Sequence, residues 1–336
     1  MTTPRSPLDP DLNPALSKFD PAASLTPRTA LEARRKAAHL TWPSISRTNN
    51  TSSKISHTET TFTGADGTQL TVSVLRSTSP THLATPASET ACILHFHGGG
   101  FCMANRFHGL NVLFDLITEL NVVVVSPEYR LAPEHAQPAQ VEDCYAALLW
   151  TVQNAGEPVL GFNLDNLILC GGSAGGNLTA GVSLLARDRG GPSLRAQMLF
   201  YPWLDDSGAS TSLTQYGDVQ PWTTEDNKTA LDWVLGANRE NKTIYTVPES
   251  AGVEELKGLP TTYVDVGEAD VFRVEDVDFV TRLWAAGVTT EFHVWPGAWH
   301  AFDTFAPSVE VSRRAARVRT EWVAGLIGQT GHWKRY

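Results

Sequence analysis

The sequence predicts an α/β fold in which a mostly parallel, twisted sheet carries helices on both faces. From about residue 92 onward, short apolar segments alternate with amphipathic segments of helical spacing. Repeated strand–helix alternation implies a parallel sheet, and strands that are apolar at consecutive positions are typical of burial on both faces. Hydrophobic residues make up 42% of the 336 residues and charged residues only 18%, so the chain can bury a large core.

The first 54 residues do not share this pattern. They are Pro-rich at the start, then helix-like over 30–40, and then polar, with a run of Ser, Thr and Asn over 44–53. We expect this segment to be an arm or lid outside the core. Next, two β-like segments, 58–63 and 69–74, flank an Ala-Asp-Gly turn sequence, which predicts a hairpin.

The parallel part of the sheet follows the hairpin. The predicted strands are 92–96, 122–125, 167–170, 197–201, 263–266 and 292–295. The predicted helices, which have apolar residues at helical spacing, are 138–154, 178–186, 277–284 and 311–322. Gly287 follows the third of these helices, at a position where glycine commonly ends a helix.

One segment, about 204–247, interrupts the alternation of strands and helices. It is rich in Ser, Thr, Asp and Asn and is too long for an ordinary connection. We therefore expect it to be a cap inserted over the strand ends. Residues 51–203 and 248–336 would then form the main α/β domain, and residues 1–50 would add an N-terminal arm to the cap.

A serine flanked by glycines stands in the run Gly-Gly-Ser-Ala-Gly-Gly at 171–176, directly after a predicted strand and before a helix. This is the context of a Gly-x-Ser-x-Gly nucleophile elbow. The turn is sharp, so small residues must flank the serine, and its hydroxyl stands at the positive end of the following helix. Ser173 is the predicted nucleophile. The alternative is a glycine-rich turn that contains a serine by chance.

A second glycine motif, His-Gly-Gly-Gly at 97–100, ends the predicted strand 92–96. Glycines allow backbone N–H groups to point into a cavity without side chains in the way. Such donors, with the N–H of the residue after the nucleophile, form an oxyanion hole that is worth a few kcal/mol in the transition state. The expected donors are Gly99, Gly100 and Ala174, and a flexible loop is the alternative interpretation.

A nucleophilic serine needs a histidine base, and three histidines follow Ser173 in the chain. His293 lies within a predicted strand, and His332 lies four residues from the end of the chain. His300 lies in a loop just past the last strand, at the carboxyl edge of the sheet. We therefore predict that His300 is the base.

The base needs a carboxylate that orients it. Asp270 follows the strand 263–266 in a loop at the same edge of the sheet, and it is the predicted acid. Asp265 lies inside that strand, which favours a structural role. Glu268, in the same loop as Asp270, is the competing candidate.

These motifs together resemble the hormone-sensitive-lipase-like group of α/β-hydrolase esterases, which includes arylacetamide deacetylases. The matching segments are His-Gly-Gly-Gly at 97–100, Tyr-Arg-Leu-Ala-Pro-Glu-His at 129–135, the Ser173 elbow, Glu-Ala-Asp at 268–270 and His-Ala-Phe at 300–302. The resemblance covers roughly residues 85–325. It implies an α/β-hydrolase catalytic domain, a helical cap built from an N-terminal arm and an insertion, and hydrolysis of carboxylic esters without a metal or an organic cofactor.

The sequence departs from the family pattern at two places. Gly172 precedes the nucleophile, where the family usually has Asp or Glu; this change affects the elbow or its local electrostatics without removing the chemistry. The acid is followed by Val271 and Phe272, where the family more often has Pro and Leu, a difference that we treat as neutral.

Several other residues have both a functional and a structural interpretation. Phe101 and the aromatic residues of the insertion, Tyr216, Trp222 and Trp233, are candidates for lining a substrate pocket, although aromatic residues of a lid more often pack it onto the body of the protein. Two polar sites outside the pocket have structural interpretations. We expect Arg130 and Glu134 to form a structural ion pair, and Asn177 to be a residue of a helix start.

Composition and charge exclude several classes of function. The 26 basic and 36 acidic residues give a net charge of −10 with no basic run, which argues against binding nucleic acid or an anionic membrane. No apolar stretch approaches the ~18 residues that span a bilayer, and the N-terminus lacks a signal-peptide-like segment, so we expect a cytoplasmic protein. The spacing of Cys92, His95, His97 and Cys102 fits no usual zinc pattern, and we expect no metal or cofactor.

The predicted function is hydrolysis of short-to-medium acyl esters of small molecules through a Ser–His–Asp triad and an acyl-enzyme. The same triad also serves lactonases, amidases and acyltransferases, which product analysis would separate. A non-catalytic ligand receptor on this fold is the alternative from another class; the gibberellin receptor, which resembles this family, lacks the catalytic histidine, whereas His300 is present here. The sequence does not determine the natural substrate or the oligomeric state, and it leaves a homodimer open.

Overall fold

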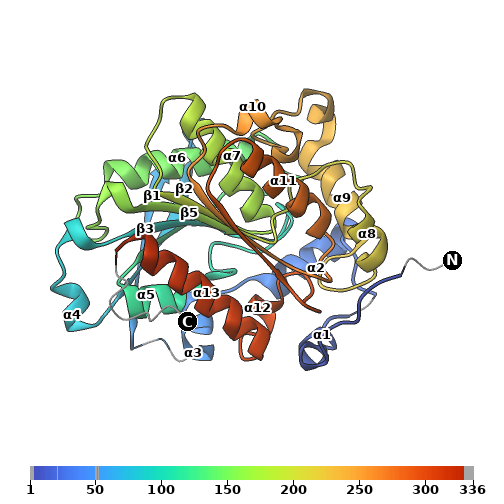
Figure 1. Ribbon diagram of the computed structural model, residues 1–336, viewed down its shortest axis with the longest axis horizontal. Coiled ribbons are helices and arrows are strands. Elements are labelled where there is room, and N and C mark those ends of the chain that lie inside the picture. The colour runs from blue at the N-terminus through green and yellow to red at the C-terminus, as the bar shows by residue number, and fades with distance from the viewer. Residues whose placement is uncertain (1–3, 21, 50, 52, 329–336) are drawn as a thin grey trace.

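The computed structural model describes residues 4–20, 22–49, 51 and 53–328, and at its centre is an eight-stranded sheet with the order β1-β2-β4-β3-β5-β6-β7-β8 (Figure 1). The strands are β1 Ile55–Thr63, β2 Gln69–Ser77, β3 Cys92–Phe96, β4 Val123–Pro127, β5 Leu167–Gly172, β6 Ala196–Phe200, β7 Thr261–Gly267 and β8 Thr290–Trp295. The pairings β1–β2 and β2–β4 are antiparallel, and the pairings from β4 to β8 are parallel. The predicted hairpin and the predicted mostly parallel sheet are confirmed.

Helices cover both faces of this sheet (Figure 1). The α-helices are α1 Asn13–Leu16, α2 Arg28–Ala38, α3 Trp42–Thr48, α4 Pro80–Leu83, α5 Phe114–Leu120, α6 Ala139–Gln153, α7 Ala174–Asp188, α8 Thr211–Tyr216, α9 Thr224–Leu235, α10 Val253–Leu256, α11 Arg273–Ala285, α12 Phe302–Phe305 and α13 Glu310–Leu326. Short 3₁₀ helices are η1 Pro10–Leu12, η2 Ala87–Glu89, η3 Leu110–Leu113, η4 Leu164–Asn166, η5 Gly236–Asn241 and η6 Pro248–Ser250. Helices α6, α7 and α11 lie on one face, and α5 and α13 on the other.

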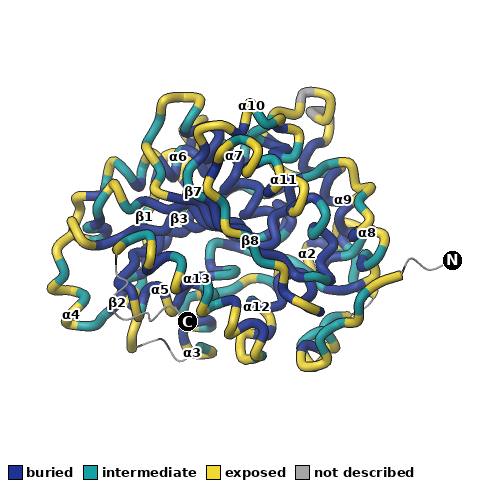
Figure 2. The backbone as a smooth tube through the Cα atoms, viewed as in Figure 1, coloured by how far each residue is buried: buried dark blue, intermediate teal, exposed yellow. Residues whose placement is uncertain are grey.

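Burial explains why the central strands are apolar at every position. In β3, Leu94 packs into the core beneath α6 and α7, whereas Ile93 packs into the core beneath α5 and α13. Figure 2 shows the resulting buried centre, with the exposed backbone at the outer helices and loops. The predicted helix 138–154 is confirmed as α6, and α11 ends as predicted, with Gly287 at φ +77° and its N–H donating to Trp284 at 3.0 Å.

Two helices differ from the sequence-based expectation. The polar run 44–53 was expected to be irregular, but α3 occupies its first part, because Thr41 and Ser44 form a capping box and Ile45 is buried. Helix α5 was not predicted. It buries an apolar face against the sheet and ends at Asn121, which adopts a left-handed conformation with φ +56°.

The expected ion pair between Arg130 and Glu134 is not formed. Arg130 binds Asp143 at 2.7 Å instead, and Glu134 binds Arg35 of helix α2 at 2.8 Å. Arg35 also donates to the carbonyl oxygen of Cys102, just after the glycine motif, at 2.7 Å. Glu134 therefore ties the N-terminal arm to the main domain, a long-range contact that sequence spacing does not reveal.

The N-terminal arm and the insertion contact each other. Arg34 of α2 binds the buried Asp226 of α9 at 2.6 Å, and the two helices lie near each other in Figure 1. The hydroxyl of Tyr216 donates to the carbonyl oxygen of Ser6 at 3.2 Å. Segments that are about 200 residues apart in the chain are thus in contact.

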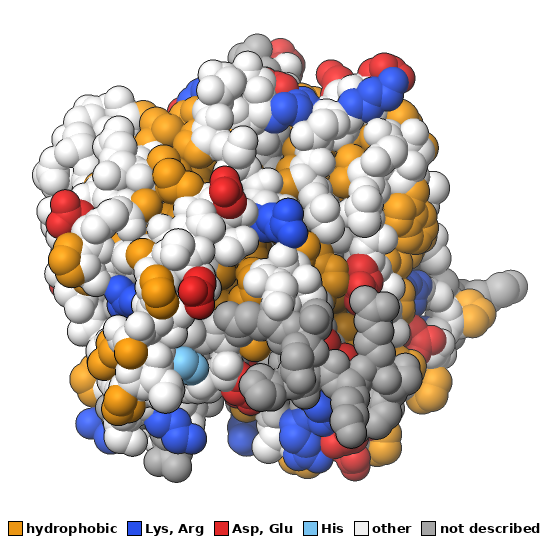
Figure 3. Space-filling view, turned by 60° about the vertical axis from the view of Figure 1, so that its left-hand side comes forward, with side chains coloured by type: hydrophobic (Ala, Val, Ile, Leu, Met, Phe, Trp, Pro, Cys, Tyr) orange, Lys and Arg blue, Asp and Glu red, His pale blue; other side chains and the backbone are white. Residues whose placement is uncertain are grey.

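Charged residues are mixed on the molecular surface. On the face shown in Figure 3, acidic and basic side chains are interspersed among uncharged ones. Among the helices that the structure describes, none has the length and apolar character needed to cross a membrane.

Candidate active site

Ser173 lies at the sharp turn between β5 and α7. Its backbone has φ +57° and ψ −121°, a strained conformation for a residue with a side chain. The turn depends on the absence of neighbouring side chains, because a Cβ atom on Gly171 would lie 2.2 Å from the carbonyl oxygen of Gly175. The Ser173 N–H donates to the carbonyl oxygen of Phe200 on the neighbouring strand at 2.9 Å, which fixes the turn against the sheet.

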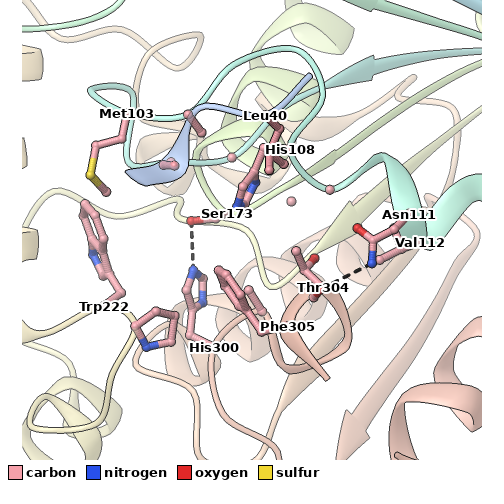
Figure 4. Close-up of a pocket in the computed structure, with 18 of the residues that line it drawn as sticks. Leu40, Met103, His108, Asn111, Val112, Ser173, Trp222, His300, Thr304 and Phe305 are labelled. Atoms are coloured by element: carbon pink, nitrogen blue, oxygen red, sulfur yellow. Dashed lines mark hydrogen bonds between the residues drawn. The ribbon is translucent and has the colours of Figure 1, made fainter. Parts of the chain in front are cut away.

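The structure brings Ser173, His300 and Asp270 together in one hydrogen-bonded chain, and Figure 4 shows the bond between Ser173 and His300. The Nε2 atom of His300 lies 3.0 Å from the Ser173 hydroxyl, and its Nδ1 atom lies 2.9 Å from Oδ2 of Asp270. Because a carboxylate only accepts hydrogen bonds, the proton resides on Nδ1, and the lone pair of Nε2 faces the serine hydroxyl. This arrangement can accept the serine proton during nucleophilic attack.

Aromatic rings and an ion-pair network hold the His300 loop. The rings of Phe272 and Tyr201 lie edge-on to the imidazole of His300, with ring centres 5.0 and 5.2 Å away. The hydroxyl of Tyr201 donates to Asp303 at 3.0 Å, and Asp303 in turn binds the buried Arg319 of α13. The loop that carries His300 is thus attached to the body of the protein three residues after the histidine.

The competing candidates lie outside this hydrogen-bonded chain. Glu268 accepts a hydrogen bond from the Gly297 N–H at 3.0 Å, and His293 is paired with Glu291 at 2.8 Å. Asp265 binds Arg319 through both oxygens, at 2.8 Å each, which fits the structural role expected for it. His332 lies outside the described residues.

The predicted oxyanion-hole residues have backbone N–H groups that are available as hydrogen-bond donors. Gly99 and Gly100 have φ values of +108° and +61°, and a residue with a side chain would be strained in this backbone conformation. Ala174 is the first residue of α7, so its N–H has no partner within the helix. In the described part of the chain, the N–H groups of these three residues have no acceptor. The loop is supported from behind by Tyr129, whose hydroxyl donates to the carbonyl oxygen of His97 at 2.7 Å.

A cavity of about 610 Å³ opens above Ser173, which is within the range of small-molecule sites. Its wall is mostly apolar and is contributed partly by the N-terminal arm, through Phe19, Leu40 and Ile45. The loop after the glycine motif contributes Met103 and the insertion contributes Trp222, on the opposite side of Ser173 from Asn111 and Val112 (Figure 4).

Of the four aromatic residues that we considered for the pocket, the structure places one on the cavity wall. The ring of Trp222 lines the cavity and lies against Gly100, where a Cβ atom would be only 2.1 Å from it. The other three lie elsewhere. Phe101 packs against Trp203, Tyr216 is fully buried with its hydroxyl on the N-terminal arm, and Trp233 packs on the main core. These three are packing residues, and their position follows from tertiary contacts between the insertion and the body.

Sequence reasoning missed several polar residues of the cavity wall, and two of them are histidines, His95 and His108. His95 comes from the end of β3, and His108 from the loop before η3. In the sequence, His95 stands out only through its spacing from Cys92, His97 and Cys102, which fits no usual zinc pattern. Within the described chain, no group of three or more His, Cys, Asp or Glu side chains is arranged to hold a metal ion. The available signal was a histidine within an otherwise apolar strand.

The structure also shows what lies beside Gly172, where the family usually has an acid. A Cβ atom at this position would lie 3.0 Å from the ring of Tyr201. The ring of Tyr201 therefore occupies the space next to the elbow. A polar contact in this region is the hydrogen bond from the Tyr201 hydroxyl to Asp303.

The chain is similar to proteins of one fold family. The family described as alpha/beta hydrolase fold matches residues 93–304. Carboxylesterase NlhH of Mycobacterium tuberculosis is 33% identical over 224 residues, which are 66% of this chain and 70% of that protein. Arylacetamide deacetylase of Bos taurus is 27% identical over 307 residues, covering 73% of this chain and 77% of that protein. The solved structure of a bacterial heroin esterase has a TM-score of 0.83 at 29% identity and covers 95% of this chain and 98% of that one.

The family match extends over more than half of the chain and includes the glycine motif, the serine elbow and the histidine loop. The solved esterase covers nearly the whole chain, so the agreement includes the arm and the insertion. The predicted fold and the predicted resemblance are both confirmed. This chain belongs to the α/β-hydrolase fold family and, within it, to the hormone-sensitive-lipase-like group of esterases.

Proposed function

We propose that this protein is a serine carboxylesterase that hydrolyses short-to-medium acyl esters of small molecules. The observation that carries the proposal is the hydrogen-bonded chain Ser173–His300–Asp270 at the base of a largely apolar cavity. The relatives support it, because their names describe carboxylesterases and a heroin esterase, enzymes that act on esters.

In the proposed mechanism, the Ser173 hydroxyl attacks the ester carbonyl carbon while His300 Nε2 takes its proton. Asp270 keeps the imidazole in the correct tautomer and stabilises its charged form. The N–H groups of Gly99, Gly100 and Ala174 would donate to the oxyanion of the tetrahedral intermediate. The leaving alcohol receives the proton from His300, and an acyl-enzyme remains.

Water then releases the acyl group by the same roles in reverse. His300 takes a proton from the water as it attacks the acyl carbonyl, and returns it to Ser173 as the serine leaves. This half of the reaction distinguishes a hydrolase from an acyltransferase, in which an alcohol would replace the water.

We further propose that residues 1–50 and 204–247 act together as a cap over the cavity. The support is the ion pair Arg34–Asp226, and the presence of both segments in the cavity wall, through Leu40 and Trp222. In this arrangement the cap, rather than the sheet, determines which substrates fit.

The test is the initial rate on p-nitrophenyl acetate, butyrate, octanoate and palmitate. We expect turnover of the shorter chains that is lost in Ser173→Ala. Asp270→Asn should lower kcat by roughly 10³–10⁴-fold, because an amide neither fixes the histidine tautomer nor stabilises the charged ring as the carboxylate does. The matched variant Glu268→Gln should keep most of the activity, since Glu268 binds the Gly297 N–H instead.

Two results would contradict the proposal. Full activity in Ser173→Ala would exclude Ser173 as the nucleophile. No hydrolysis of any chain length by folded wild-type protein would exclude a general esterase.

A further inference from the structure

The cavity has a polar arm on one side of the nucleophile. We call it the histidine arm and define it by His95, His108, Asn111, Thr304 and Phe305. Figure 4 shows His108, Asn111, Thr304 and Phe305 together on one side of Ser173, and Met103 and Trp222 on the other. Only the histidine arm presents imidazole groups other than His300 to the cavity, within the part of the chain that the structure describes.

The hydrogen bonds of His95 determine which of its nitrogens carries the proton. Its Nδ1 atom lies 3.2 Å from the Ser126 hydroxyl, and that hydroxyl donates its own proton to the carbonyl oxygen of Arg106 at 2.7 Å. The Ser126 oxygen therefore accepts from Nδ1–H, and Nε2 carries a lone pair. No described residue donates to this Nε2 atom, so the arm contains a free hydrogen-bond acceptor.

His108 lies beside the nucleophile. A Cβ atom on Gly98 would be 3.7 Å from His108 Nδ1 and 3.6 Å from Ser173 Cβ, so the two side chains flank the same point. The ring lies edge-on to Phe305, with centres 5.9 Å apart. Neither ring nitrogen has a hydrogen-bond partner among the described residues. A ligand group in the arm would therefore meet an unsatisfied imidazole next to the reacting bond.

Both imidazoles are neutral at physiological pH. Burial, and next the neighbouring His97 and His108, lower the pKa of His95 to about 3. Burial, and next His97 and His300, lower the pKa of His108 to about 4. A carboxylate in the arm would thus gain no ion pair, and a charged group would lose its hydration. The arm favours a neutral group that can donate to His95 and either donate to or accept from His108.

A hydroxyl group meets these requirements. It donates one hydrogen bond and accepts others, so it matches the fixed tautomer of His95 and both tautomers of His108. When an analogue lacks the hydroxyl, the buried polar groups that would bond to it are left without a partner. The free-energy cost of these unpaired groups makes the site selective for the hydroxylated substrate.

We propose that the histidine arm makes this enzyme selective for esters that carry a hydroxyl group close to the ester bond. The proposal rests on the proposed esterase function. The hydroxyl belongs either to the acyl part or to the alcohol part of the ester, and the two sources are separated by the substrates used in the test.

The test compares pairs of esters in which a hydroxyl replaces a methyl group of similar size. The acyl pair is p-nitrophenyl 3-hydroxybutyrate and p-nitrophenyl 3-methylbutyrate. The alcohol pair is 2-hydroxyethyl butyrate and propyl butyrate, and the hydrolysis of these two esters is measured by titration of the released acid. In one pair we expect the hydroxylated ester to have the higher kcat/KM, by about tenfold, which corresponds to one or two hydrogen bonds.

The variants His95→Phe and His108→Phe should each reduce this ratio severalfold toward one. His82→Phe is the matched control, because the His82 ring also bonds to a serine hydroxyl, that of Ser77 at 2.8 Å, but lies outside the cavity. His82→Phe should keep the wild-type ratio. If His95→Phe does not fold, as judged by circular dichroism, His108→Phe decides the outcome.

The outcomes separate this proposal from the esterase function. Equal kcat/KM within both pairs overturns the proposal and leaves the esterase function intact. A preference that survives in both histidine variants also overturns it. No hydrolysis of any of the four esters overturns the esterase function, and the proposal with it.

Discussion

The two cavity histidines His300 and His95 are suited to different roles, because their hydrogen-bond partners differ. His300 bonds through Nδ1 to the Asp270 carboxylate, at 2.9 Å, which supports a positive charge on the ring. His95 bonds through Nδ1 to the neutral hydroxyl of Ser126, and burial keeps its pKa low. The first ring is suited to proton transfer and the second to recognition.

A buried carboxylate next to the acid loop leads to a prediction about pH and stability. Asp276 of α11 is fully buried, and neither of its oxygens has a hydrogen-bond partner among the described residues. Burial, and next the carboxylates of Glu275 and Asp270, raise its pKa well above the usual range. The folded pKa thus exceeds the unfolded value of about 3.9, so this group favours folding at low pH and loses that contribution as the pH rises.

We expect Asp276→Asn to raise the Tm by roughly 2 °C or more at pH 8, because the amide avoids the cost of ionisation in a buried site. The gain should be smaller at pH 5, where the wild-type carboxyl is protonated more fully. Thermal unfolding of both proteins at the two pH values measures this difference. The exposed neighbour Asp278→Asn is the control, and a gain of the same size in that variant would contradict the explanation.

At the scale of elements, local patterns predicted those helices and strands whose own sequence repeats with the correct period. Helix α6, Ala139–Gln153, has such a repeat and was predicted within one residue at each end. Helix α3 was missed because its sequence is mostly polar. It begins with a capping box, contains one buried isoleucine and is stabilised by tertiary packing.

The role of Asn177 depends both on its position in the helix and on tertiary contacts. It lies in the first turn of α7 as expected, and it donates to the carbonyl oxygens of Trp203 and Thr246, which lie at the two ends of the insertion.

The strand–turn–helix unit that carries Ser173 tolerates no extra atom at Gly171. A Cβ atom there would lie 2.2 Å from the Gly175 carbonyl oxygen. We expect Gly171→Ala to lower the free energy of unfolding by about 1–3 kcal/mol, the usual cost of overpacking, and to abolish most esterase activity by moving Ser173. Denaturant unfolding and the rate on p-nitrophenyl butyrate measure the two effects. Gly156→Ala, where no atom lies within 4 Å of the added group, should change neither.

At the scale of the whole molecule, one buried arginine connects the last helix to the sheet and to the histidine loop. Arg319 of α13 binds Asp265 of β7 and Asp303, and its guanidinium lies 3.8 Å from the centre of the Phe200 ring. All three charged groups are almost completely buried. Removal of the cation would leave two buried carboxylates without an opposite charge beside them.

We therefore expect Arg319→Met to lower the free energy of unfolding by about 3–5 kcal/mol, the cost of breaking a buried ion pair. Arg313→Met, on the same helix, removes an exposed pair with Glu310 and a hydrogen bond to the carbonyl oxygen of Ser308, and it should cost about 1 kcal/mol or less. Urea unfolding of the two variants gives both values. Equal losses would show that the buried network does not stabilise the fold.

The amino-acid sequence alone predicted the alternation of strands and helices from residue 92 onward, and it indicated the three residues of the candidate triad. These features depend on local periodicity, on glycines that a sharp turn requires, and on strand-end loops that parallel strands bring to one edge of a sheet. The packing of distant segments, which the sequence did not reveal, places Trp222 on the cavity wall and Tyr216 away from it, pairs Glu134 with Arg35, and turns two neutral histidines toward the cavity. These features arise from contacts between segments far apart in the chain, and such contacts depend on how the segments pack rather than on the spacing of residues within any one of them.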